Sequence, residues 1–161
     1  MENRKAEGQM YKSKGFTIIE ILIVIAVIAI LVGIALPRFR GMQEEGKIAQ
    51  AKSELRTLQS AIESYYIHNN NAYPATGATW QSALTGATPN ILGAALLDPF
   101  TASTQYVYAN DGGSPVKYYV LYSIGVGANG SATVSTAGVV TETNGSSCIY
   151  VTNGATKDAQ P

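Results

Sequence analysis

A run of sixteen apolar residues near the amino terminus, Ile21 to Leu36, most constrains how this 161-residue chain can fold. With the preceding Phe16 to Ile19, the segment would measure roughly 31 Å as a helix, which is enough to cross the hydrocarbon core of a bilayer. Its many β-branched residues disfavour helix in water, but lipid requires every backbone polar group to be satisfied within the segment and so imposes helix. We therefore expect a membrane-spanning helix over residues 16–37.

Glu20 lies inside this apolar segment, where a charge is costly. A carboxylate at the centre of a spanning helix costs about 2.5–3.5 kcal/mol on insertion scales, and such residues are functional candidates by default. Just before it, a basic and polar leader meets the apolar helix at Gly15, a small residue that a membrane protease could cut after. Cleavage there would free a positively charged amino group on Phe16, one helical turn from Glu20. Such an amino group is the kind of partner that the carboxylate needs.

An ordinary secretory signal peptide is the competing interpretation. The small residues Gly33 and Ala35 form a triplet that a signal peptidase could cut. Against this, Glu20 would lie inside the hydrophobic region, that region is too long, and Pro37 would follow directly after the cut.

The residues Lys14-Gly15-Phe16-Thr17-Ile18-Ile19-Glu20, with the helix that follows, resemble the type III signal of prepilins and type II secretion pseudopilins. The resemblance implies that a prepilin peptidase cuts between Gly15 and Phe16, that the same enzyme N-methylates Phe16, and that Glu20 guides assembly. It also associates a proline at the place of Pro37 with local loosening, so we predict a helix break there; the alternative is that Pro37 only marks the membrane edge.

Residues 38–70 are predicted to continue the helix in amphipathic form. One stripe of apolar residues recurs at spacings of three and four, with charges on the other faces: Ile48, Ala51, Leu55, Leu58, Ile62 and Tyr65. A dimeric coiled coil is the alternative. Fewer than three heptads are present, which favours packing of the stripe against the globular part of the same chain.

Residues 71–161 are predicted to form a small antiparallel β-sheet domain with loops and short helices. Strands are expected at Gln105–Ala109, Lys117–Ile124, Ala132–Val134, Val139–Glu142 and Cys148–Thr152. Short helices are expected at Thr79–Leu84, capped by Thr79, and at Asn90–Leu97. Both faces of the second strand are apolar, so one face should pack on the helix stripe and the other on a loop or a neighbouring subunit.

The fold class is therefore α+β and pilin-like, a long amino-terminal helix packed on a small antiparallel sheet. We divide the chain into a cleaved leader (1–15), a transmembrane or filament-core helix (16–37), the amphipathic half of the helix (38–70) and the sheet domain (71–161).

Several functional classes lack support in the sequence. The formal net charge is zero, and removal of the leader would leave seven basic and nine acidic side chains, so nucleic-acid binding is not expected. Catalysis needs a nucleophile with a base, paired carboxylates or a metal cluster, and we find none. His68 is interpreted as a helix-end residue, Cys148 as a small residue in a strand, and Gly125–Gly130 as a turn rather than a phosphate loop.

Four downstream segments, in the order Asn71-Ala72-Tyr73-Pro74, Asp98-Pro99-Phe100, Tyr106-Val107-Tyr108 and Tyr119 to Gly125, are similar to the globular domain of the major type II secretion pseudopilin. That resemblance implies a calcium site after the Tyr-Ser-x-Gly segment, formed by aspartates and backbone carbonyls. Here no Asp or Glu occurs between Lys117 and Thr141, and calcium prefers carboxylate ligands. We expect no cofactor, with calcium as the open alternative. Type IV pilins often close their domain with a cysteine pair, which a chain with one cysteine cannot form.

The resemblance favours a structural subunit of a type IV pilus-like filament, a pseudopilin of a type II secretion system, and not an enzyme. The alternative is a major or minor type IV pilin acting in adhesion, motility or DNA uptake; an enzyme held by a signal anchor ranks third. Expected partners are further copies of the chain, the prepilin peptidase, an inner-membrane assembly platform, and minor pilins or pseudopilins. The expected location is the bacterial inner membrane with the leader cytoplasmic, then a periplasmic or cell-surface filament.

Overall fold

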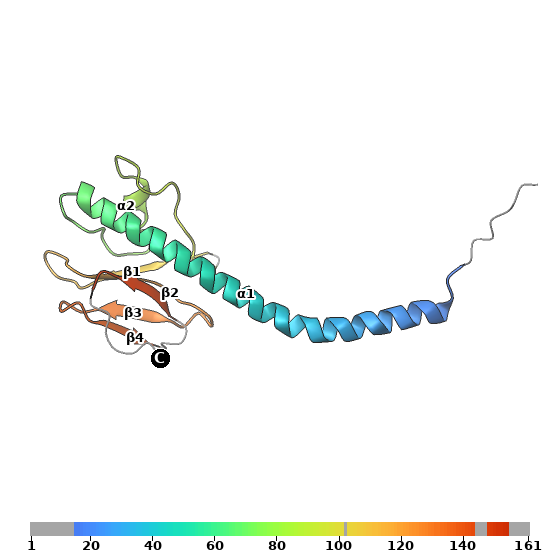
Figure 1. Ribbon diagram of the computed structural model, residues 1–161. Helices are drawn as coiled ribbons and strands as arrows, with labels where there is room; N and C mark the ends of the chain where they lie inside the picture. The colour runs from blue at the N-terminus through green and yellow to red at the C-terminus, as the bar shows by residue number, and fades with distance from the viewer. Residues whose placement is uncertain (1–14, 102, 144–147, 155–161) are drawn as a thin grey trace, which may run out of the picture. The chain divides into compact units, whose positions relative to one another are not determined.

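The computed structural model describes residues 15–101, 103–143 and 148–154 (Figure 1). The predicted leader therefore lies outside the described residues, except for Gly15. Tertiary contacts divide the chain into one unit that ends at Gly41 and a second that begins at Met42. The two units differ in kind, because all the buried core residues in the described part of the chain belong to the second.

A single α-helix, α1, runs from Ile18 to His68 and contributes to both units. Within residues 18–41 every side chain is exposed. By length and composition α1 is the one helix in the described part of the chain that could cross a membrane. Its exposed apolar side chains have no partner within the first unit, as expected of a segment made for lipid or for other helices.

Pro37 lies inside α1, which continues past it. The helix break predicted at Pro37 is therefore not present in this structure. A proline inside a helix removes one backbone hydrogen bond and crowds the preceding turn, at a cost of about 3 kcal/mol, yet α1 continues through it. Loosening at Pro37 after assembly stays a prediction.

The carboxy-terminal half of α1 packs against the sheet of its own chain (Figure 1). The predicted stripe forms the contact: Ala51, Leu55, Leu58 and Ile62 are buried, Tyr65 packs at the margin, and Ala61 adds to the buried set. Ile48 is only partly covered. Packing within the chain, rather than a coiled coil, is thus what covers the stripe.

Five strands form two antiparallel sheets in the described residues. The larger sheet has the order β1-β2-β5, and the smaller is the hairpin β3-β4. The strand bounds are β1 Val107–Asn110, β2 Tyr119–Ser123, β3 Ser131–Val134, β4 Val140–Thr143 and β5 Ile149–Thr152. All five predicted strands are confirmed to within one or two residues, and the Gly125–Gly130 segment forms the turn between β2 and β3.

The two faces of β2 pack against different layers. Tyr119 and Leu121 join the α1 stripe in the main core, together with Tyr106 and Tyr108. Val120, on the opposite face, packs with the β3-β4 hairpin in a second buried cluster. The second unit is therefore layered as helix, three-stranded sheet and hairpin, and both apolar faces are covered inside the chain (Figure 1).

Two tyrosines tie the sheet to the helix through carboxylates on α1. Tyr106 donates to Glu54 Oε2 at 2.6 Å, and Tyr119 donates to Glu63 Oε1 at 2.7 Å. Burial, followed by the hydrogen bond to the carboxylate, raises the pKa of each phenol well above its usual range. Apolar packing and these charge-assisted hydrogen bonds together fix the helix on the sheet.

The short-helix predictions are corrected by the structure. α2 covers only Ser82–Thr85 and has no side-chain cap, and the Thr79 carbonyl instead accepts from the backbone and hydroxyl of Ser82. Residues 90–97 are not helical.

The backbone of residues 90–97 is bound to residues 81–84 instead of to itself. The buried Gln81 side chain donates to Leu96 O at 3.0 Å and accepts from Leu96 N at 2.7 Å. Ile91 and Leu92 both donate to the Leu84 carbonyl. These tertiary bonds outweigh the helix propensity of the Ala and Leu residues in this segment.

Candidate functional site

Gly15 and Phe16 precede the first turn of α1 and are exposed. A side-chain carbon placed on Gly15 would meet no atom within 4 Å. The described fold therefore gives no steric reason for a glycine at this position. A requirement for glycine here has to come from something that acts on the chain, as a peptidase that recognises the junction would.

Thr17 caps the amino terminus of α1, and its side chain contacts the backbone of Glu20. The Glu20 backbone N–H lies 3.3 Å from Thr17 Oγ1 and 3.1 Å from Thr17 O. A threonine followed three residues later by a glutamate is the sequence signature of a capping box, so the signal for this cap was present in the sequence and was missed. The capping residue Thr17 lies two residues after Gly15, and the helix begins at the next residue, Ile18.

The Glu20 carboxylate lies in the exposed first turn of α1. A negative charge at a helix amino terminus is favoured by the helix dipole. No ion pair to Glu20 is formed among the residues that the structure describes. Large exposed apolar side chains surround it along the chain, with Ile18 88% exposed and Ile21 52% exposed. The site thus combines a free carboxylate with a bare apolar helix.

The two single residues considered as chemical candidates have structural surroundings. His68 ends α1, and its Nδ1 lies 2.8 Å from the Ser64 carbonyl oxygen, which confirms a helix-end residue. Cys148 directly precedes β5, is half-buried, and packs against the second core cluster. Burial, and then the Glu142 carboxylate, raises the pKa of the Cys148 thiol to about 12, so the reactive thiolate is scarce at neutral pH.

A buried carboxylate that sequence reasoning treated as part of a loop joins two of the quoted segments. Asp98 is 1% exposed. Its Oδ1 accepts from Phe100 N and from Ser123 Oγ, and its Oδ2 accepts from Ile124 N, each at 3.0 Å. Asp98 therefore fixes the loop after residue 97 to the end of β2. The sequence held the residues of this contact, but their pairing across 25 positions gave no local signal.

The residues of the β2–β3 turn do not fit a conventional calcium site. Calcium takes several oxygen ligands, usually with carboxylate charge, and the turn contains no Asp or Glu. Asp98, the carboxylate next to the turn, is already engaged by three protein donors. Within the described residues, no group of three His, Cys, Asp or Glu side chains is placed to hold a metal ion.

Comparisons with known proteins agree with the geometry of the amino terminus. Residues 10–36 match the prokaryotic N-terminal methylation motif. The chain is 35% identical over 66 residues to the type II secretion system core protein G of Pectobacterium carotovorum, which covers 41% of this chain and 42% of that protein. It is 46% identical over 59 residues to the fimbrial protein EcpB of Eikenella corrodens, covering 37% of each. Over its amino-terminal part, the chain is similar to type IV pilins and to type II secretion core proteins.

A third relative of this pilin-like chain is the type IV major pilin protein PilA of Myxococcus xanthus, 42% identical over 55 residues, which cover 34% of this chain and 25% of that protein. The chain thus matches less than half the length of each of these three relatives. No solved structure matches the chain.

The pilin and pseudopilin family consists of structural proteins rather than enzymes, in agreement with the prediction from sequence. The motif and the apolar helix are consistent with a precursor in the inner membrane.

Proposed function

We propose that this chain is a structural subunit of a type II secretion pseudopilus, processed between Gly15 and Phe16 and polymerised through the amino-terminal half of α1. The observation that carries the proposal is the exposed apolar helix, with a carboxylate in its first turn that forms no ion pair among the described residues. Lipid covers such a helix in the precursor, and the helices of neighbouring copies cover it in the filament.

Glu20 receives a partner in this assembly. Its carboxylate neutralises the amino group of Phe16 on an adjacent copy, which makes the register of neighbouring helices a matter of charge as well as packing. N-methylation of Phe16 keeps the positive charge of that amino group, so the pair persists after the modification. The exposed position of both residues leaves them available for this contact.

Two observations favour a secretion pseudopilin over a pilus subunit. Matches to type II secretion core protein G reach 77 residues, in the relative from Escherichia coli, whereas the matches to the two pilins described above span 59 and 55 residues. The chain has one cysteine and so lacks the cysteine pair with which type IV pilins often close their domain.

A type IV pilin acting in adhesion, motility or DNA uptake is the second candidate. It is favoured by the higher identity of the fimbrial relative, 46% against 35% for the first core protein G.

Deletion of the gene separates the two functions. Loss of one or more exported proteins from the culture medium, with surface fibres retained, supports the pseudopilus. Loss of surface fibres or motility with normal export overturns it in favour of the pilus. Complementation with the intact gene is the control, because it excludes an effect on neighbouring genes.

A further inference from the structure

The outward face of α1 in the second unit carries two cations that are not paired. Lys52 and Arg56 lie one turn apart and are exposed, and no ion pair to either is formed within the described part of the chain. Like charges at this spacing repel each other and weaken the helix slightly. Neither residue has an acidic neighbour three or four positions away along α1.

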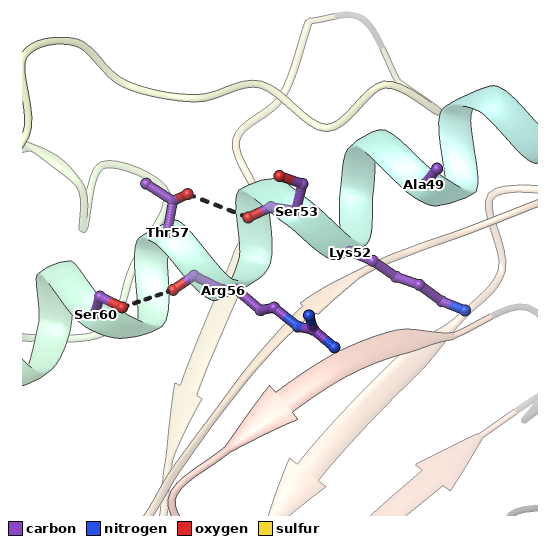
Figure 2. Close-up of a pocket in the computed structure, with 6 residues that line it drawn as sticks. All are labelled: Ala49, Lys52, Ser53, Arg56, Thr57 and Ser60. Carbon is purple, nitrogen blue, oxygen red and sulfur yellow. Dashed lines mark hydrogen bonds between the residues drawn. The ribbon is translucent and has the colours of Figure 1, made fainter.

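These cations line an open groove of about 560 Å³ whose other residues are small. Figure 2 shows Lys52 and Arg56 extending in the same direction from the helix. The remaining lining residues are Ala49, Ser53, Thr57 and Ser60.

Two of the three hydroxyl groups of the groove, those of Thr57 and Ser60, are already used within the helix. Thr57 donates to Ser53 O and Ser60 donates to Arg56 O, each at 3.1 Å (Figure 2). The charged binding capacity of the groove therefore lies in the two cationic groups, while its small side chains leave room for a close approach. Such a surface suits an acidic segment with a narrow profile, such as a helix.

The same helix carries the complementary charge. Glu44 and Glu45 are exposed, lie in the same unit, and have no ion pair among the described residues. They precede Lys52 by seven or eight residues, which is roughly 10–12 Å along a helix axis. A spacing of seven residues is about two turns, so Glu45 and Lys52 share a face.

We infer that Lys52 and Arg56 of one copy bind Glu44 and Glu45 of the next copy in the filament. The inference rests on the proposed function, because it requires parallel copies displaced along the filament axis. A displacement of roughly 10–12 Å sets the acidic pair of one helix level with Lys52 of its neighbour, and Arg56 lies one turn further along. The contact is head-to-tail, so it repeats from copy to copy without closing a ring.

Charge reversal and its compensation test this contact in cells that assemble the full chain. Lys52→Glu alone and Glu45→Lys alone should each lower the yield of sheared filaments about tenfold, because like charges then face each other in every contact. The two substitutions together should restore the yield to within about twofold. Lys117→Glu is the matched control, since it reverses an exposed lysine on another element and should leave the yield unchanged.

A crosslinking experiment tests whether the same two positions are close to each other in neighbouring copies. In a Cys148→Ser background, chains with Glu45→Cys and chains with Lys52→Cys are co-expressed with different tags and treated with a short thiol crosslinker. Mixed dimers should form between the two chains, and should be lost when Glu20→Ala is added.

The outcomes separate this inference from the proposed function. Normal filament yield from both single reversals, or failure of the double variant to recover while Lys117→Glu assembles normally, overturns the Lys52–Glu45 contact and leaves the filament intact. Absence of filaments from the unaltered chain overturns both. Equal levels of processed chain in the membrane show that a reversal acts on assembly and not on folding.

Discussion

The two halves of α1 differ both in apolar content and in what covers their apolar side chains: residues 21–36 are an apolar run, whereas residues 42–68 carry one apolar stripe among polar residues. In the second unit, Leu55, Leu58 and Ile62 are completely buried against the sheet of the same chain. In the first unit, Ile25, Leu31 and the other large apolar side chains are about half exposed or more. A helix face that the chain covers itself supports folding, whereas a face that the chain leaves bare supports insertion and then assembly.

The difference in polar contacts follows the same division. In the second unit the carboxylates of Glu54 and Glu63 accept hydrogen bonds from buried tyrosines. In the first unit the backbone N–H of Glu20 contacts the Thr17 hydroxyl, but its carboxylate forms no ion pair in the described part of the chain. One set of acids completes a monomer, and the other is available to a second molecule.

Replacing Gly15 with leucine should have the largest effect of any single change. The described fold has room for the side chain, so the fold should tolerate it, but the peptidase should no longer cut. The expected result is an uncut precursor, visible as a slower band on a gel and as a mass that includes residues 1–15. Efficient cleavage of the Gly15→Leu chain would contradict the assigned processing site.

Leu58→Ala and Leu31→Ala remove the same atoms from the two halves of α1. Leu58 is completely buried, so its truncation should lower the free energy of unfolding by about 2–5 kcal/mol. Leu31 is 61% exposed, and its truncation should change the unfolding of the second unit by less than about 0.5 kcal/mol. Denaturant unfolding of the full chain in detergent, followed by tryptophan fluorescence from buried Trp80, measures both. Equal losses would contradict the division of the helix.

Asp98→Asn should weaken the loop contact without disturbing the first unit. The amide keeps the size of the side chain but replaces one acceptor oxygen with an NH2 donor group. That group cannot accept from the donors that now bind the Asp98 carboxylate. The free energy of unfolding should fall by about 1–3 kcal/mol. Filament yield at low temperature, where the second unit remains folded, should be unchanged; a complete loss of filaments there would assign Asp98 a direct part in assembly.

The stability of the second unit should fall in alkali. The pKa of Tyr106 is raised above its ordinary value near 10 by burial and then by Glu54. The stabilising contribution of the neutral phenol is therefore fully present below pH 10 and is lost as the pH rises above that value, by up to about 1.4 kcal/mol per pH unit. Tyr106→Phe should flatten this dependence in unfolding curves recorded from about pH 8 to pH 11. An unchanged slope in that variant would exclude Tyr106 as the cause.

Sequence reasoning located the elements whose signal is local. The spacing of Ala51, Leu55 and Leu58 was sufficient to predict a packed stripe, and alternation and turn residues were sufficient for the strands. The helix expected over residues 90–97 was wrong because its backbone partners come from Gln81 and Leu84, a tertiary contact that propensity does not describe. The strand order was left open for the same reason.

The candidate site was predicted in a similar way. Gly15, Phe16 and Glu20 were chosen from residue types and spacing alone, and their roles in processing and assembly remain predictions. The Thr17 cap could have been found from its spacing to Glu20. The Asp98 contact with Ser123 and Ile124 could not, because it joins segments far apart in the sequence.

Filament yield from Glu20→Ala tests most directly whether the bare half of α1 is an assembly surface. The account predicts that the variant reaches the membrane in normal amounts and assembles poorly, because the amino group of Phe16 then has no carboxylate to bind in the adjacent copy. Glu20→Gln, which keeps the size but loses the charge, should behave in the same way. Normal yields of sheared filaments from both variants, with the chain present at the usual level in the membrane, would contradict the account.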